Sequence, residues 1–258
     1  MRSTNPVNAY TASEFLFTGR RVGDATRMSR YQTLYQQHPE DYDALVQAED
    51  HDGDLRALLR ETWGDLRGRE ALELGVGTGR VTRWMLRDGA SVRGIEQSPA
   101  MVALARARLA SEGFAVDALA VGDAYAERFA PSWAQVAVAA WVFGHAVTWH
   151  PEDWSARVRR AIDAMRAAVV PGGRVVVVET LGTGYETPVV APALAPYFDL
   201  LASEGFTRAW ARSDYVFASA SEAERLTRFF FGDQKGDRVR DAASPRVPEC
   251  TGVWSCAV

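Results

Sequence analysis

The chain has 258 residues, of which 47% are hydrophobic and 24% are charged. This is an ordinary globular composition, with room for one large domain or a domain with a cap. The net charge of −4 argues against a nucleic-acid partner, because such proteins carry a basic surface for the phosphate backbone. No stretch resembles a signal peptide, and the longest apolar run, around Ala134 to Phe143, is far below the roughly 20 residues of a membrane span.

Residues 1 to about 60 precede the first clear strand pattern. Between Arg20 and Leu59, the tyrosines Tyr31, Tyr35 and Tyr42 are mixed with charges and short apolar spacings, which predicts two or three helices. From the residues alone, this segment is either a surface helix pair or a cap over the part that follows.

A glycine turn follows the first predicted strand. Glu70–Leu74 has the pattern of a strand, Gly75, Gly77 and Gly79 stand at alternate positions after it, and Arg80–Arg87 has the pattern of an amphipathic helix. Glycines permit a sharp bend and the close approach of a ligand to the backbone. Such a strand–turn–helix unit holds a nucleotide cofactor beyond the carboxyl ends of an open α/β sheet. The dinucleotide fingerprint would need its third glycine where this chain has an arginine.

The next two predicted strands also end near an acid. Val92–Glu96 ends in Glu96, ahead of a predicted helix, and Ala115–Val121 is followed by Gly122 and Asp123. A carboxylate at the second strand end can accept both hydroxyls of a ribose. A carboxylate at the third can accept a hydrogen bond from an amino group. Together with Glu73 at the first strand end, these acids form a joint signal for one nucleoside cofactor.

The G-x-G-x-G spacing, with Glu73 two residues before it, resembles the first motif of class I S-adenosylmethionine-dependent methyltransferases. That cofactor carries an ammonium and a sulfonium group and no phosphate, so a carboxylate at the turn attracts it. The resemblance implies that Glu73 binds the amino-acid end, directly or through water, Glu96 the ribose and Asp123 the adenine. It also implies cofactor contacts at Gly75, Gly77, Thr78, Gly79, Gln97, Met101, Gly122, Ala124 and Trp141.

The rest of the chain alternates strands and helices, which predicts a mostly parallel sheet covered on both faces. Further strands are expected at Gln135–Val142, Arg174–Thr180, Ala209–Ala218 and Gly252–Val258. The helix Trp154–Val170 is expected to stop at the following Pro-Gly-Gly, since proline cannot continue a helix and glycine suits its C-terminal cap. The resemblance implies an α/β, Rossmann-like methyltransferase fold with a mixed seven-stranded sheet, an antiparallel last strand and an N-terminal helical lid. Residues 1–60 would form this lid and residues 61–258 the cofactor-binding domain.

Two features of the C-terminal region bear on flexibility and location. A helix is expected from Ser221 to Phe231, with a serine cap and early acids, followed by a long polar loop over Gly232–Pro245. Cys250 and Cys256 fall on one predicted strand, about 20 Å apart at roughly 3.3 Å per residue, too far for a disulfide. A reduced, cytoplasmic setting is expected.

Methyl transfer is an in-line displacement, and alignment of the reacting atoms supplies much of its acceleration. His145, after the fourth predicted strand, is the candidate base, because imidazole is partly neutral near physiological pH. It is equally well interpreted as a structural histidine bonded to a loop carbonyl. Tyr185 can orient an acceptor, and Glu179 either holds a cationic substrate or caps a neighbouring element. The acid that catechol-type enzymes of the family use at the fourth strand end is replaced by Ala140 and Trp141, so no metal is expected.

These patterns predict a cytoplasmic enzyme, monomeric or homodimeric, that moves a methyl group from S-adenosylmethionine to an oxygen or nitrogen of a small-molecule metabolite without a metal ion. Neither nucleic acid nor a membrane is expected as a partner. One alternative is a different group transferase on the same fold, such as an aminopropyl transferase. Another is a protein that binds the cofactor without catalysis, and the residue at position 80 disfavours a dinucleotide-dependent oxidoreductase.

Overall fold

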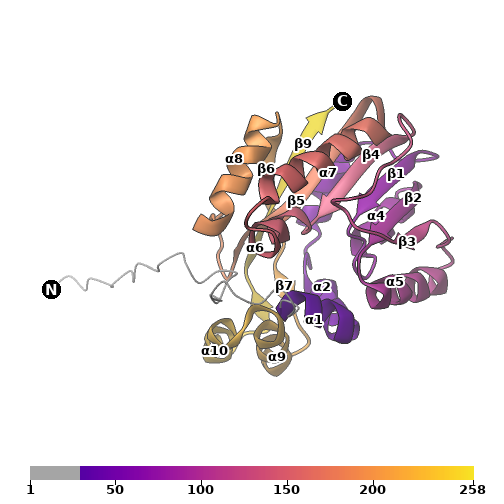
Figure 1. Cartoon of the computed structure of the whole chain (residues 1–258). Coiled ribbons are helices and arrows are strands. Elements are labelled where there is room, and N and C mark those ends of the chain that lie inside the picture. Colours follow the sequence, from indigo (N-terminus) through magenta and orange to yellow (C-terminus); the bar gives the residue numbers. More distant parts are fainter. Residues whose placement is uncertain (1–29) are drawn as a thin grey trace.

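The computed structural model describes residues 30–258, and its centre is one mixed sheet of seven strands (Figure 1). The strands are β1 (Glu70–Leu74), β2 (Ser91–Glu96), β3 (Leu119–Val121), β4 (Ala134–Ala140), β5 (Val169–Thr183), β6 (Thr207–Arg212) and β9 (Glu249–Ala257). Their order is β3-β2-β1-β4-β5-β9-β6. The last strand, β9, is antiparallel to both of its neighbours and the first five run parallel. The predicted α/β class and the antiparallel last strand are confirmed.

Alternate residues of the central strands face two separate cores, because successive side chains of a strand point to opposite faces. On β4, Ala137 and Ala139 pack with helices α7 (Trp154–Ala168) and α8 (Ala195–Ser203). On the same strand, Val136 and Val138 pack with α3 (Asp54–Trp63) and α4 (Arg80–Arg87). Helix α5 (Pro99–Ser111) packs beside α4 through a smaller cluster around Leu109. Both faces of the sheet are therefore covered, as the alternation of elements predicts.

The junction between α7 and β5 differs from the prediction. The helix ends at Ala168, and the strand begins at Val169 rather than at Arg174. Val169 already pairs with β4, and after a register shift the ladder resumes at Arg174. The Pro-Gly-Gly segment is thus a bulge within a strand. A β-carbon at Gly173 would lie 2.5 Å from a backbone oxygen of β4, so the strand can approach this closely only with glycine.

The predicted sixth strand, Ala209–Ala218, is wrong in its second half. Strand β6 stops at Arg212, and β7 (Tyr215–Val216) pairs with β8 (Arg246–Val247) in a separate two-stranded sheet. Asp214, between β6 and β7, forms ion pairs with Arg212 at 2.7 Å and Arg246 at 2.9 Å. These partly buried ion pairs hold the chain where it leaves the main sheet.

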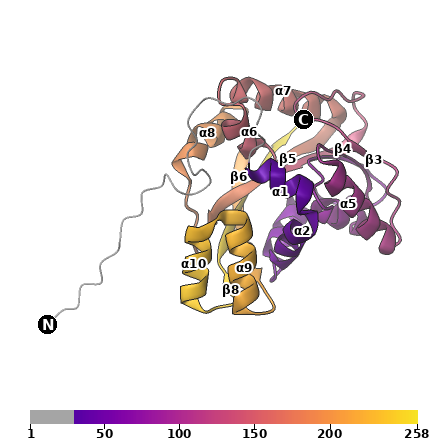
Figure 2. The same ribbon diagram turned by 60° about the horizontal axis from the view of Figure 1, so that its bottom comes forward.

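Two helices lie between β7 and β8 (Figure 2). Helix α9 (Ala220–Phe231) begins at a Ser219 cap, one residue before its predicted start. The predicted loop over Gly232–Pro245 is wrong for most of its length, because α10 (Asp233–Ala242) occupies it. Asp233 in the first turn and Arg240 in the last complement the helix dipole, so a largely polar segment is helical here.

The N-terminal helices lie against α9 at one end of the sheet (Figures 1 and 2). They are α1 (Arg30–Gln37) and α2 (Pro39–Ala48), and α3 follows with its apolar residues in the core. The expected boundary at residue 60 falls inside α3. The part of the predicted lid before Arg30 lies outside the described residues.

Short helices complete this set: α6 (Ala146–Trp149) and the 3-10 turns η2 (Phe143–His145) and η3 (Pro192–Leu194). No helix within residues 30–258 has the length and apolar character that crossing a bilayer requires. Cys250 and Cys256 both lie on β9 as free cysteines.

Candidate functional site

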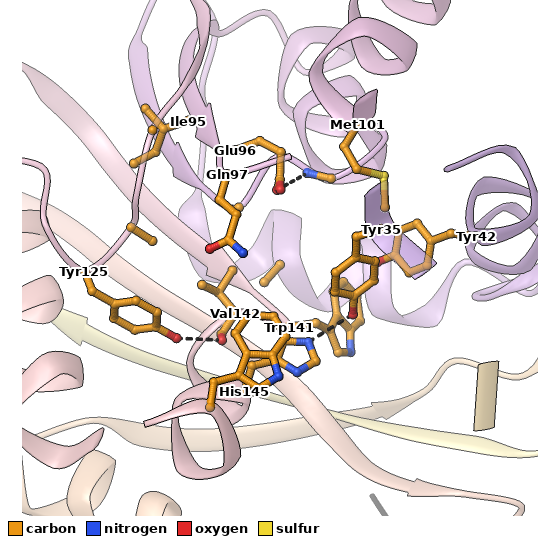
Figure 3. A pocket seen from close by; sticks show the side chains of 16 residues that line it. Tyr35, Tyr42, Ile95, Glu96, Gln97, Met101, Tyr125, Trp141, Val142 and His145 are labelled. Carbon is orange, nitrogen blue, oxygen red and sulfur yellow. Dashed lines mark hydrogen bonds between the residues drawn. The ribbon is translucent and has the colours of Figure 1, made fainter. Parts of the chain in front are cut away.

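The main candidate site is a cavity of about 620 Å³ at the carboxyl ends of the parallel strands, which we call the strand-end cavity (Figure 3). The glycine turn lines it with Gly75 and Gly77, the second strand end with Glu96, and the fourth with Trp141. In an open α/β sheet this edge is where ligands bind, because the loops that follow the strands meet there.

The glycine turn adopts a backbone shape that needs glycine. Gly75, Gly77 and Gly79 all have positive φ, at +76°, +57° and +90°. A β-carbon at Gly75 would lie 2.2 Å from Val142 Cγ2, so β1 and the end of β4 can approach each other only without a side chain here. Gly79 has another task. It precedes α4 and packs against α5, and it does not line the strand-end cavity.

We expect Gly75→Ala to lower the free energy of unfolding by about 1–3 kcal/mol more than Gly113→Ala does, because overpacking adds to the strain. Gly113 is the matched control, since it has a φ of +85° and open space around its Cα. Urea unfolding followed by circular dichroism measures both variants. Equal losses would show that the contact with Val142 relaxes without cost.

Glu96 holds the glycine turn and the start of α5 together. Its Oε2 accepts from the Gly77 N–H at 3.0 Å, and its Oε1 accepts from the Ser98 N–H at 2.9 Å. Burial raises the pKa of Glu96, while these backbone hydrogen bonds oppose the rise. A carboxylate has about four acceptor positions, so Glu96 retains acceptor capacity toward the cavity that it lines.

Glu73 and Thr78 lie at an adjoining side cavity of about 310 Å³, which also contacts Gly75 and Gly77. Glu73 is 1% exposed and its Oε2 accepts from Thr82 Oγ1 at 2.5 Å. Burial, with the nearby Glu96 carboxylate, raises the pKa of Glu73 to about 8, and a cation beside it would reverse this shift. Thr78 Oγ1 is buried without a hydrogen-bond partner, which is uncommon unless a ligand or water supplies one.

The other predicted cofactor residues divide into two groups. Gln97, Met101, Gly122, Ala124 and Trp141 line the strand-end cavity. The side chain of Asp123 does not line it, and its Oδ1 accepts from the Tyr125 N–H at 2.9 Å. The adenine role of Asp123 stays a prediction.

Trp141 lines both the strand-end cavity and the side cavity. It also lines a third space, a further chamber that is described below. Its φ is +55°, a conformation that is uncommon for a bulky residue and is found mostly at functional sites. The guanidinium of Arg80 lies 4.3 Å from the centre of its ring. Arg80 is itself buried and pairs with Glu49 Oε2 at 2.7 Å.

The further chamber, of about 750 Å³, shares Tyr35, Tyr42, Trp141 and His145 with the strand-end cavity. We call it the aromatic chamber. Tyr31, Tyr215, Phe230 and Phe231 contribute rings, and Glu49, Glu179 and Glu249 contribute carboxyl groups.

His145 lies on the wall that the two spaces share. Its Nε2 lies 3.0 Å from Tyr35 Oη (Figure 3). Its ring stacks on Trp149, with the ring centres 4.5 Å apart. Burial lowers the pKa of His145 to about 4, so the imidazole is uncharged near neutral pH. The hydrogen-bond partner of its Nε2 is the Tyr35 hydroxyl and not the loop carbonyl that the structural interpretation supposed.

The structure does not bring Tyr185 to either space. It lines an outer cavity with Lys235 and Arg246, and its carbonyl accepts from Cys250 Sγ at 3.4 Å. Glu179 does line the aromatic chamber, and its Oε1 accepts from the Gly144 N–H at 2.9 Å. It therefore binds a neighbouring element while it faces the chamber.

Several residues of the site were not predicted as site residues. Tyr35 and Tyr42 come from α1 and α2, and Tyr125 follows β3 and donates to the Val142 carbonyl at 3.0 Å. The four-residue spacing of Tyr31 and Tyr35 places both rings on one helix face and was a usable signal. No sequence pattern pointed to Phe230 or Glu249.

Comparison with known proteins gives one family match and one curated relative. Residues 71–173 match the family described as a methyltransferase domain. An uncharacterized methyltransferase of Bacillus cytotoxicus is 28% identical over 162 residues, which cover 59% of this chain and 68% of that protein.

Solved structures share the fold at low sequence identity. A putative methyltransferase of Bacillus halodurans has a TM-score of 0.52 at 13% identity, covering 79% of this chain and 97% of that one. Phosphoethanolamine N-methyltransferase 2 of Haemonchus contortus, solved with S-adenosyl-L-methionine, has a TM-score of 0.53 at 18% identity. That match covers 90% of this chain and 60% of the worm enzyme. At such identities the likeness concerns the fold.

Proposed function

We propose that the chain is a class I, S-adenosylmethionine-dependent methyltransferase that methylates an oxygen or nitrogen of a small-molecule metabolite without a metal ion. The match of residues 71–173 to a methyltransferase domain supports this proposal. The observation that carries this proposal is the pair of adjoining spaces at the strand ends, which share the wall of Tyr35, Tyr42, Trp141 and His145. The strand-end cavity suits the methyl donor, and the aromatic chamber suits an acceptor. An acceptor atom and a methyl group that meet where the two spaces adjoin can be held in line, which supplies a large part of the rate.

The residues around the first space fit S-adenosylmethionine, which supplies an electrophilic methyl group when bound. Glu96 would accept the ribose hydroxyls, since it faces the cavity and retains acceptor positions. Glu73 would hold the ammonium group, whose charge offsets the cost of ionising a carboxyl that is 1% exposed. The unpartnered Thr78 hydroxyl would donate to the carboxylate of the same amino-acid end.

His145 is the proposed base for an acceptor whose proton must leave. Its uncharged imidazole has one nitrogen lone pair available, and Tyr35 lies within hydrogen-bond distance of Nε2. When the acceptor atom displaces sulfur at the methyl carbon and the thioether leaves, the acceptor's proton would pass to the imidazole, directly or through the tyrosine hydroxyl. Tyr185 stays a proposal for orienting the acceptor, although it lies at the outer cavity.

His145→Ala should lower turnover by on the order of a hundredfold with little change in cofactor affinity, because Glu96 and the glycine turn remain. His51→Ala is the control, since His51 is exposed and lines neither space. Steady-state rates at saturating acceptor and calorimetric titration of S-adenosylmethionine separate the two effects. Equal turnover for the two variants would remove His145 from the mechanism.

The helical cap is part of this proposal. Tyr31 and Tyr35 of α1 and Tyr42 of α2 line the spaces, which supports a lid formed by the segment up to about residue 60. We also propose a cytoplasmic location and a monomer or homodimer.

The proposal is tested by incubating the pure protein with methyl-labelled S-adenosylmethionine and a metabolite extract. Mass spectrometry should detect a product heavier by one methyl group. A product heavier by an aminopropyl group would support the alternative transferase. Cofactor binding without any labelled product would support the non-catalytic alternative.

A further inference from the structure

Three carboxyl groups of the aromatic chamber are almost fully buried. Glu49 is 7% exposed, Glu179 is 4% exposed and Glu249 is 1% exposed. Arg80 compensates Glu49 at 2.7 Å, whereas no ion pair within residues 30–258 involves Glu179 or Glu249. An ionised carboxylate in such a place is costly unless a cation approaches it. The chamber is therefore built to attract positive charge.

Glu249 has an oxygen without a partner. Its Oε1 accepts from Thr180 Oγ1 at 2.6 Å, and no hydrogen bond to its buried Oε2 is formed within residues 30–258, although the nearby Thr183 hydroxyl opposes the rise of its pKa. Lys235 influences Glu249 through space, but its Nζ donates to the Thr183 carbonyl at 2.6 Å. Burial raises the pKa of Glu249 to about 8. A buried acceptor of this kind has a high free-energy cost until a donor reaches it, and the space it faces is the chamber.

The walls of the chamber complement these carboxyl groups. Tyr31 packs against Phe230 with ring centres 5.1 Å apart, and Phe230 against Phe231 at 5.0 Å. Ring faces attract organic cations, and the effect is largest where water is excluded. An anionic acceptor is disfavoured, because Arg80, the one arginine among the described residues that line the chamber, is already neutralised by Glu49.

Building on the proposed methyl transfer, we propose that the acceptor is a small organic amine that enters as a cation. Its ammonium group lies against Glu249 and Glu179, and its carbon skeleton lies among the rings of Tyr31, Phe230 and Phe231. The amine donates a hydrogen bond to Glu249, and one ammonium proton passes to that carboxylate, which frees the nitrogen lone pair that displaces sulfur at the methyl carbon.

The first test separates a metabolite extract into cationic, neutral and anionic fractions on ion-exchange columns. Each fraction is incubated with the full 258-residue chain and methyl-labelled S-adenosylmethionine. Labelled product is expected from the cationic fraction. Product only from the neutral or anionic fraction would overturn the amine proposal and leave methyl transfer standing. Absence of product from every fraction would contradict methyl transfer itself, and the amine proposal would fall with it.

The second test is Glu249→Gln, which preserves the shape of the side chain and the oxygen bonded by Thr180. Within residues 30–258 Oε2 accepts no hydrogen bond, so a loss of rate at an unchanged unfolding temperature is assigned to the ligand. We expect the rate with a dilute cationic fraction to fall tenfold or more, while the affinity for S-adenosylmethionine and the unfolding temperature stay unchanged. Glu152→Gln, the same change at an exposed site, should have no effect. An unchanged rate for Glu249→Gln would overturn the proposal.

Discussion

Replacing Glu96 by alanine should weaken binding of S-adenosylmethionine by at least about a hundredfold. Hydrogen bonds to a charged group contribute about 1.5–3 kcal/mol each, and a ribose offers two hydroxyls. The variant also removes the acceptor of the Gly77 and Ser98 N–H groups, so the shape of the turn is lost with the ligand contacts. Isothermal titration with S-adenosylmethionine and with S-adenosylhomocysteine measures the effect.

Two further variants sharpen this experiment. Glu96→Gln keeps one acceptor oxygen and should give an intermediate loss of affinity. Glu70→Ala removes an acid from the opposite end of β1, where Glu70 pairs with Arg93 at 3.5 Å near the surface, and should leave affinity unchanged. If Glu96→Ala binds the cofactor as well as the unmodified chain does, the assignment of the strand-end cavity is wrong.

Arg80→Met should lower the free energy of unfolding by about 3–5 kcal/mol, because it leaves the buried Glu49 carboxylate without its cation. The guanidinium also donates to the Val46 carbonyl at 3.1 Å and stacks on Trp141. The pair joins α2 to the start of α4, so its loss should loosen the N-terminal helices first. Urea unfolding of the variant measures the change.

The double variant Arg80→Met with Glu49→Gln is the matched comparison. It removes both charges and should recover much of the stability, since a neutral pair lacks the desolvation penalty of a buried charge. Arg160→Met, at an exposed position, should change stability by less than about 0.5 kcal/mol. If Arg80→Met alone lowered the free energy of unfolding by as little as Arg160→Met does, water would have to reach Glu49.

Local patterns predicted much of the sheet. β1 and α4 have their predicted bounds, and β2 begins one residue before its predicted start, because apolar alternation and a glycine turn are encoded within a few residues. The errors arose where distant contacts decided the backbone. The Pro-Gly-Gly segment became a strand because β4 pairs with Val169. β6 stopped because Asp214 pairs with Arg246.

The strand-end cavity also shows that features encoded within a few residues were predicted correctly. Gly75, Gly77 and Glu96 occupy one continuous turn and the next strand end, and the structure places all three at the strand-end cavity. Tyr185 was placed by its position after a strand, yet Gly182 has a φ of +135° and the loop leads to the outer cavity. The direction in which a loop leaves a sheet depends on what packs beside it.

The sequence by itself determined the α/β class, the glycine turn and the position of Glu73 and Glu96 at the strand-end spaces, because each of these follows from a short window with its own period or spacing. Only the tertiary structure decided the aromatic chamber. Thr251 and Glu49 are 202 positions apart in the sequence, yet Thr251 Oγ1 lies 3.5 Å from Glu49 Oε1. Glu249 is buried beside residues of β5 and α10 that no local pattern connects to it. Burial and its electrostatic consequences arise from packing between distant segments, and no short stretch of sequence specifies them.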